Sequence, residues 1–452
     1  MNRQMKLIGF LQAQNCSNYP ASWRHPASKP NWFSREYYEE IGRTLERGKF
    51  HLAFFDDRLA IPDRFGEDFT ETVRHGIRAA KLDPLAVAMA MGLATRHLGI
   101  GFTYSTTYYE PFHVARVFAT VDLLLNGRVA WNVVTSLNDS EAANFGASEH
   151  LAHDLRYDRA DEFMEVVLGH WNTWEDDAIV FDREKGLFAD PDKVHRLDHR
   201  GKFFTSRGPF TVPRSAQGHP VIIQAGQSGR GKQFASRWGE LIFVIYPNLE
   251  IATRQYADMK RALGDRAPQV AIAPAIYPVV AETQAEAEDK FAAIDRLASP
   301  IDSLTLLSEV LNFDFATKPM DEPFSADELR SIGGLQAVRD RVVQLSGKAN
   351  PTVQDFVEFS GRGRLKELPT FVGSTKSVAD KLEEWFTGGA CDGFVVAATH
   401  VPGTYDDFVQ LVVPELQRRG LFRREYQGET LRESLGLPRP QWRSEGRARH
   451  QA

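Results

Sequence analysis

Hydroxyl, imidazole and phenol side chains gather directly behind one apolar stretch of the chain. Residues 128–136 (RVAWNVVTS) predict a buried strand that ends in Thr135 and Ser136, and a helix that begins near His153 carries Tyr157 four residues later. In an α/β barrel the loops that follow the strands form the open mouth and carry the chemistry. We therefore expect these four side chains to lie at such a mouth.

A glycine-rich stretch could supply a phosphate site. Residues 226–232 (GQSGRGK) follow an apolar strand pattern and open a predicted helix, and helix N-termini bind phosphate through backbone N–H groups and the helix dipole. The stretch departs from magnesium-dependent nucleotide triphosphate loops at Gln233, where Ser or Thr is needed to bind the metal. The phosphate of another ligand is the favoured interpretation. A nucleotide triphosphate site and a plain glycine-rich turn are the alternatives.

Two candidate groups also have a purely structural interpretation. Asp57 ends an apolar strand, so its carboxylate either serves a site at the mouth or caps the next segment. His153 and Tyr157 could likewise belong to a capping cluster with Asp154 and Asp158. The spacing alone leaves both alternatives open.

The composition excludes several classes of protein. The 452 residues carry a net charge of −6, which argues against a nucleic-acid partner, and no run of about 18 apolar residues predicts a membrane span. The N-terminus lacks the apolar segment of a signal peptide, which predicts a cytoplasmic protein. Two cysteines cannot form a disulfide framework. His195 and His199 have no third ligand nearby, so no metal site is expected, and the hydrolase motifs GxSxG and HExxH do not occur.

Apolar strand patterns alternate with helix patterns along the chain, which predicts a parallel sheet. Eight strands are expected, at residues 5–12, 51–56, 98–104, 128–136, 220–225, 240–245, 271–281 and 393–399. The seventh is the least regular because Pro274 and Pro278 cannot donate hydrogen bonds to a ladder. Eight parallel strands with helices between them predict an α/β fold of the TIM-type (β/α)8 barrel class.

Segments that interrupt this alternation are interpreted as insertions in one domain, which spans residues 1–436. Residues 174–213 and about 298–370 are expected to lie over the barrel mouth, and the longer insertion, before the last strand, could act as a lid. Residues 437–452 form a polar tail.

Several ordered motifs resemble those of one enzyme family. They are residues 48–50 (GKF), 105–109 (STTYY), 113–116 (HVAR), 127–136 (GRVAWNVVTS), 144–146 (NFG), 153–161 (HDLRYDRAD) and 412–416 (VVPEL). Together they resemble the bacterial-luciferase-like flavin monooxygenases. Within that family the chain is similar to the branch of nitrilotriacetate and dibenzothiophene-sulfone monooxygenases, and more to the sulfone enzymes.

This resemblance implies a barrel enzyme that uses reduced FMN as a co-substrate together with O2. A separate NAD(P)H:flavin reductase would supply the reduced flavin, and the enzyme would be a homodimer or homotetramer. By motif match, the FMN contacts would be Asp57, Thr103, Ser136, His153, Tyr157, Ser228 and Gly229. The glycine-rich turn at Ser228 would then hold the flavin phosphate.

The substrate is the least determined part of this hypothesis. Phe54 and Phe243 match apolar pocket positions, whereas Asn18 aligns with a histidine of the sulfone enzymes and cannot shuttle a proton near neutral pH. We expect oxygenation of an aromatic or heteroaromatic xenobiotic, such as a sulfone or a halogenated ring, and assign no catalytic acid or base. An aminopolycarboxylate or a long-chain alkane is the alternative substrate. A flavin-binding protein without oxygenase activity is the alternative function.

Overall fold

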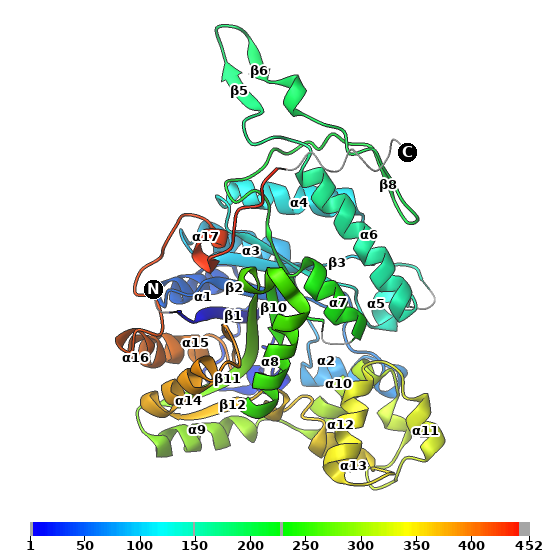
Figure 1. Cartoon of the computed structure of the whole chain (residues 1–452). Coiled ribbons are helices and arrows are strands. Elements are labelled where there is room, and N and C mark those ends of the chain that lie inside the picture. The colour runs from blue at the N-terminus through cyan, green and yellow to red at the C-terminus, as the bar shows by residue number, and fades with distance from the viewer. Residues whose placement is uncertain (1–2, 148–149, 227–228, 443–452) are drawn as a thin grey trace.

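Eight parallel strands close into a barrel in the computed structural model, which describes residues 3–147, 150–226 and 229–442 (Figure 1). In order around the barrel the strands are β1 (Lys6–Gln12), β2 (Leu52–Asp56), β3 (Gly99–Ser105), β4 (Val129–Val134), β9 (Val221–Gln224), β10 (Leu241–Val244), β11 (Ala271–Ala281) and β13 (Gly393–Ala397). The ring closes where β13 pairs with β1, with Lys6 opposite Gly393. The predicted TIM-type barrel is therefore confirmed.

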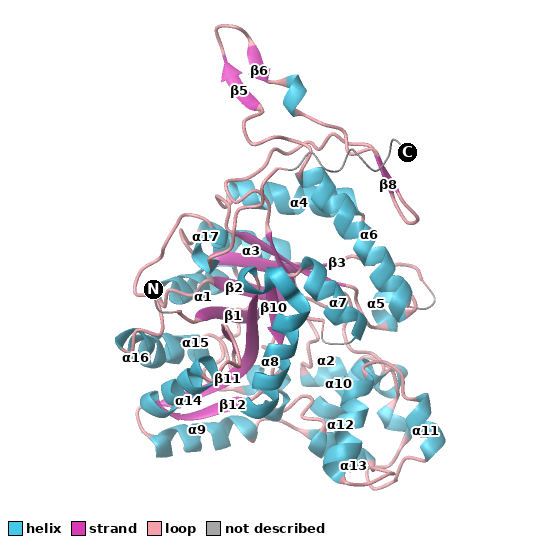
Figure 2. Ribbon diagram, in the orientation of Figure 1, coloured by secondary structure: helices cyan, strands magenta, loops and turns pink. Residues whose placement is uncertain are grey.

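Helices cover the outer side of the barrel (Figure 2), so β3 is buried at every residue, as expected for a parallel sheet covered on both faces. The covering helices are α1 (Arg35–Arg47), α3 (Pro84–Leu93), α4 (Pro111–Leu124), α6 (His153–Trp171), α7 (Gly229–Trp238), α8 (Leu249–Leu263), α9 (Gln284–Asp295), α14 (Thr375–Thr387), α15 (Gly403–Asp407) and α16 (Val413–Arg418). Ser34 and Asp83 cap α1 and α3 through their side chains, as local capping rules predict. In the described part of the chain no helix is long and apolar enough to cross a membrane.

Shorter elements occupy the connections. They are α2 (Thr70–His75), α5 (Asp139–Asn144), α17 (Leu431–Leu435), 3-10 helices at Pro20–Arg24, Phe65–Glu67, Pro191–Lys193, Gly264–Gln269, Phe315–Thr317 and Leu365–Glu367, and a π-helical turn at Phe408–Val412.

The long strand β11 pairs with three strands, one of which is its barrel neighbour β13. Its first half pairs with β10 and its second half with β12 (Thr370–Ser374), a strand that the sequence did not predict. Pro274 stands opposite Val244, the last residue of β10, and Pro278 stands opposite Phe371 near the start of β12. Each proline thus lies near the end of a partner strand, where a missing N–H donor costs least.

Residues 298–370 form a helical segment with a hydrophobic core of its own, here named the cap. Its helices are α10 (Pro300–Leu311), α11 (Ala326–Ser331), α12 (Gln336–Ser346) and α13 (Val353–Phe359). The cap is bound to loops that follow barrel strands. Arg24, after β1, forms a bidentate ion pair with Asp302 (2.6 and 2.9 Å), and Asn138, after β4, donates to Glu309 (2.7 Å). The cap therefore lies against the barrel mouth.

Residues 174–213 lie on the outer side of the helical layer (Figure 1). They form two short hairpins, β5 (Ile179–Asp182) with β6 (Leu187–Ala189), and β7 (His199–Arg200) with β8 (Thr205–Ser206). Glu162 in the middle of α6 accepts hydrogen bonds from the backbone of Phe203 (2.9 Å) and Phe204 (2.7 Å). The segment was expected to cover the mouth, whereas these contacts hold it against α6.

The first residues of the polar tail return to the same segment. Arg439 forms an ion pair with Asp176 (2.7 Å), and the indole N–H of Trp442 donates to the carbonyl of Asn172 (3.0 Å). The described part of the tail is therefore held against the start of the 174–213 segment.

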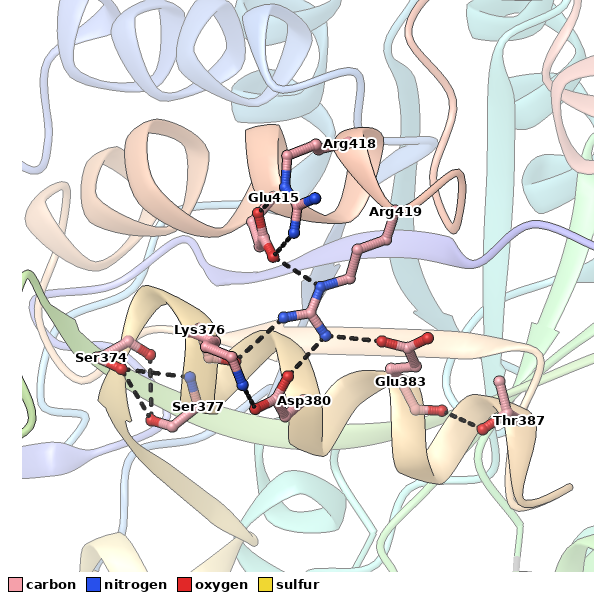
Figure 3. Close-up of polar contacts among 9 residues, drawn as sticks. All are labelled: Ser374, Lys376, Ser377, Asp380, Glu383, Thr387, Glu415, Arg418 and Arg419. Atoms are coloured by element: carbon pink, nitrogen blue, oxygen red, sulfur yellow. Dashed lines mark hydrogen bonds and ion pairs between the residues drawn. The ribbon is translucent and has the colours of Figure 1, made fainter.

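Two of the last helices are joined by one arginine (Figure 3). Arg419 bridges Glu415 of α16 (2.8 Å) to Asp380 (2.8 Å) and Glu383 (2.7 Å) of α14. Hydrogen bonds from Arg418 and Arg419 lower the pKa of Glu415 to about 2. At neutral pH this network stabilises the helical layer through attraction between the arginine and the oppositely charged carboxylates.

Candidate functional site

Three phenylalanine rings close the barrel interior below its mouth. Phe10 of β1 lies 5.3 Å from Phe54 of β2 and 5.3 Å from Phe243 of β10, and the last two rings are 6.1 Å apart, measured between centroids. Phe54 and Phe243, the two apolar members of the expected pocket set, are therefore brought together with Phe10, which the sequence did not single out. This aromatic floor gives the mouth an apolar base that excludes water.

Polar side chains lie one layer above this floor. Side chains two residues apart in a strand share a face, so Gln12 and Asp56 point to the same side as the aromatic floor. On the neighbouring strands the Thr103 hydroxyl donates to the Phe55 carbonyl (2.8 Å) and accepts from the Asn132 amide (2.8 Å). We name Gln12, Asp56, Thr103 and Asn132 the polar ring.

The polar ring contains buried atoms without partners. Within the described residues, Gln12 Nε2, Asp56 Oδ1 and Asn132 Oδ1 have no hydrogen-bond partner. Buried polar atoms in folded proteins are nearly always paired, and leaving one unpaired costs roughly 1–3 kcal/mol. One donor and two acceptors are thus available to a ligand at the mouth.

A buried cation stands next to Ser136 on the β4 side of the mouth. Ser136 adopts a left-handed conformation (φ 56°), its hydroxyl donates to Ser105 (3.0 Å), and its carbonyl accepts from the guanidinium of Arg156. Arg156 also contacts His150, whose other ring nitrogen lies 2.8 Å from the Tyr108 hydroxyl. Arg156 of the motif 153–161 therefore holds the segment that follows β4.

Tyr157 and His153 lie in the first turns of α6. Tyr157 is buried, with its ring 5.7 Å from Phe234 of α7, and its ring is 5.1 Å from that of His153. The His153 side chain is 47% exposed and contacts Asp154 (2.8 Å). The N-cap of α6 is Ala152 and no side chain caps this helix, so the alternative of a capping cluster is not supported.

The glycine-rich turn leads into α7, beside the start of α6. Gly229 is the first residue of α7 and is exposed, while Ser228 lies outside the described residues. Arg230 forms ion pairs with Asp158 (2.9 Å) and Asp161 (2.8 Å) of α6, which hold the two helix starts together. Tyr157 and the N-terminus of α7 therefore lie on neighbouring helix starts, as a shared phosphate site requires.

Asp57 follows the polar ring on β2. Its carboxylate accepts a hydrogen bond from the backbone N–H of Arg58 (2.8 Å). Burial raises the pKa of Asp57, Lys81 acts in the opposite direction, and Asp56 adds to the increase. The raised pKa favours a protonated carboxyl group that could also donate to a ligand.

Asn18 follows β1. Its amide donates to the hydroxyl of Tyr277 on β11 (2.8 Å), and its backbone carbonyl accepts from Arg78 (3.1 Å). The structure thus places Asn18 in a hydrogen-bonded chain at the mouth.

A cavity of about 320 Å³ lies beside the mouth, between the loop after β1 and helix α1. Residues that line it include Cys16, Trp23, Trp32, Tyr37 and Tyr38. None of the described residues expected to bind flavin lines this cavity, although Gln12 of the polar ring does. Burial raises the pKa of the Cys16 thiol to about 11, so the thiol is not a nucleophile at neutral pH.

Residues 5–391 match the model of one family, described as luciferase-like monooxygenase. The chain belongs to this family. It is 46% identical over 450 residues to dibenzothiophene-sulfone monooxygenase of Rhodococcus erythropolis, covering 97% of this chain and 98% of that protein. It is 38% identical to nitrilotriacetate monooxygenase component A of Aminobacter aminovorans, covering 97% and 98%. The crystal structure of a riboflavin lyase with modified FMN and riboflavin matches with a TM-score of 0.88 at 32% identity and 98% coverage of both chains.

As a luciferase-like, flavin-dependent monooxygenase, the chain must hold a flat ring system with polar edges, and the mouth fits one. The aromatic floor is apolar, while the polar ring offers the Gln12 donor and the Asp56 and Asn132 acceptors that lack partners. The start of α7 provides backbone N–H groups for a phosphate. Every described residue of the expected contact set lies at a strand end or a helix start of this mouth: Asp57, Thr103, Ser136, His153, Tyr157 and Gly229.

Proposed function

We propose that this chain is the oxygenase component of a two-component, FMNH2-dependent monooxygenase. It would use O2 to oxygenate an aromatic or heteroaromatic compound, such as a sulfone or a halogenated ring, with reduced FMN supplied by a separate NAD(P)H:flavin reductase. The observation that carries the proposal is the polar ring of unpaired buried atoms above the aromatic floor. The similarity to a dibenzothiophene-sulfone monooxygenase supports the substrate class, and the name of the nitrilotriacetate enzyme, component A, supports a second component.

Reduced flavin would supply the electrons that activate O2, and the chain would bind, orient and shield the reactants. The polar ring would fix the ring system, and the aromatic floor would keep water from beneath it. Arg156 places a buried positive charge beside Ser136, where it can stabilise an anionic reactant. The start of α7, with Tyr157 beside it, would hold the phosphate.

Oxygen transfer can be measured in a single turnover. Protein with photoreduced FMN, kept under nitrogen, is mixed with buffer that contains ¹⁸O2 and dibenzothiophene sulfone, and the product is analysed by mass spectrometry. Incorporation of one ¹⁸O atom per product molecule is expected. The variant Asn132→Leu removes one unpaired acceptor and the hydrogen bond from the side-chain amide to Thr103. It should therefore bind FMN more weakly and form less product.

The alternatives give different results in the same experiment. Labelled product from nitrilotriacetate or a long-chain alkane, and not from the sulfone or a chlorinated phenol, would replace the aromatic substrate class. Tight FMN binding without labelled product from any of them would favour a flavin-binding protein without oxygenase activity. Oxidation of NADPH by the chain alone, with FMN present, would contradict a separate reductase.

We also propose that the chain forms a homodimer or homotetramer. The β5–β6 hairpin exposes Phe181 and Phe188, each 58% accessible, and Val180 is 46% accessible. An isolated two-stranded hairpin is marginally stable, and an apolar patch of this kind is usually covered by another chain. Light scattering should report an oligomer, and the double variant Phe181→Ser with Phe188→Ser should reduce its mass. An unchanged mass would contradict this interface.

A further inference from the structure

Arg78 is a buried arginine at the mouth that the flavin contacts do not use. It follows β2, is 5% exposed, and has a left-handed backbone conformation (φ 54°) that is unfavourable for a residue with a side chain. Its Nη2 donates to the backbone carbonyl (3.1 Å) and to Oδ1 (3.3 Å) of Asn18. The Asn18 amide in turn donates to Tyr277 (2.8 Å), which completes a chain of three side chains across β1, β2 and β11.

The guanidinium of Arg78 is held charged by carboxylates that do not bond to it. Within the described residues it forms no ion pair, and its Nε has no hydrogen-bond partner. Glu367, Glu309 and Asp56, none of which forms an ion pair with it, outweigh burial and raise its pKa. The unpaired Nε–H is nevertheless a buried donor, and leaving such a donor without an acceptor is costly, so an oxygen atom of a ligand would complete the pairing.

The two ends of this series of hydrogen-bonded side chains, Arg78 and Tyr277, are both donors. Arg78 offers its unpaired Nε–H, and Tyr277 accepts from Asn18, so its own hydroxyl proton remains available. A guanidinium binds planar or tetrahedral oxygen groups with two parallel N–H bonds, which gives it a strong preference for carboxylate and related anions. These two donors would therefore bind a ligand that supplies oxygen acceptors.

Resting on the proposed function, we propose that Arg78 selects substrates that carry an anionic oxygen group, a carboxylate, sulfonate or sulfinate, with Asn18 and Tyr277 as its positioning residues. The ring of the substrate would then face the aromatic floor while its charged group binds at Arg78. Within the aromatic and heteroaromatic compounds of the proposed function, this predicts tighter binding of those that also carry an ionised oxygen group.

Binding of matched probes tests this selectivity. Dissociation constants are measured by calorimetry, with FMN present, for benzenesulfonate and methyl phenyl sulfone, and for benzoate and methyl benzoate. Wild-type protein should bind at least one anion about 10-fold or more tightly than its neutral partner, as one charge-assisted bond would give. Arg78→Gln should abolish that preference and leave the neutral probes unchanged. The anion that binds more tightly, benzenesulfonate or benzoate, identifies the kind of charged group that the site prefers.

A nearby arginine provides the control. Arg74 on α2 is 62% exposed and already paired with Glu71, so Arg74→Gln removes the same charge without changing the preference. If Arg78→Gln does not fold, Arg78→Lys keeps the charge but loses the planar fork and should bind the anion several-fold more weakly, with neutral probes unaffected.

Three results would overturn the proposal. They are equal binding of charged and neutral probes by the wild type, a preference that survives in both Arg78 variants, and an equal loss in Arg74→Gln. Affinity for FMN is measured on the same proteins and should not change in Arg78→Gln; a marked loss would assign Arg78 to the cofactor instead. Failure of wild-type protein to bind FMN would count against the proposed function. The role of Arg78 in anion selectivity would still be tested by measuring binding of the same probes without FMN.

Discussion

Gly226→Ala should weaken FMN binding by about 10- to 100-fold. A methyl group on Gly226 would lie 2.7 Å from the carbonyl oxygen of Gly231 and 2.8 Å from Oε1 of Gln224, closer than a Cβ atom can approach. Because the Gly231 carbonyl belongs to the backbone of α7, the turn must shift and displace the N–H groups at the helix start. One charge-assisted hydrogen bond contributes roughly 1.5–3 kcal/mol, and its loss corresponds to about this change in affinity.

The assay compares FMN with riboflavin, which has the same ring system without the phosphate. Titrations that follow flavin fluorescence should show weaker FMN binding by Gly226→Ala and unchanged riboflavin binding. Gly333→Ala is the control, because its added methyl group would meet the nearest atoms at 3.9 Å. Wild-type affinity for FMN in Gly226→Ala, or an equal loss for both flavins, would refute the assignment of the phosphate to the start of α7.

Three further predictions concern stability. Thr103→Val removes two buried hydrogen bonds and should lower the free energy of unfolding by roughly 1–3 kcal/mol in urea titrations, whereas Thr103→Ser should not; equal losses would exclude those bonds as the cause. Arg419→Met should destabilise at pH 7 more than Arg418→Met. Arg419, but not Arg418, also pairs with Asp380, whose folded-state pKa is lowered by hydrogen bonds from Lys376 and Arg419, so this difference is present above about pH 4 and should shrink as the pH falls below it; a constant difference would contradict it. Burial raises the pKa of Asp122 to about 6, so wild-type stability relative to Asp122→Asn should fall as the pH rises from about 4 through 6, and parallel stability profiles would contradict that shift.

The barrel strands were predictable because their signals are local. Short apolar runs bounded by turn residues located all eight strands, and Ser34 and Asp83 were recognisable as caps from the few residues around them. Strand β12 escaped prediction because it is half exposed and is defined by its pairing with the end of β11, which no local pattern reveals. The position of residues 174–213 was not predictable either, because it depends on contacts between residues far apart in the sequence, such as Glu162 with Phe203.

The candidate site was predictable only in part. Thr103 and Ser136 stand out because hydroxyl groups that end buried strands point to the mouth of a barrel. Gln12, Asp56 and Asn132 did not stand out, because an amide or carboxylate at a strand end is equally typical of a turn or a cap. They matter because some of their polar atoms lack hydrogen-bond partners, and this can be recognised only once the neighbouring strands are placed in register.

The separate core of the cap has a consequence for how this enzyme can diversify. Helices α10 to α13 of the cap pack around their own apolar residues, whereas Leu365 and Leu368 at its end pack with the barrel strands, so substitutions within those helices leave the barrel interior unchanged. The cap also supplies Glu309 and Glu367, two carboxylates that act on Arg78 at the mouth. Exchange of residues 298–370 between homologous enzymes could therefore change which compounds are accepted while the oxygen chemistry is inherited intact.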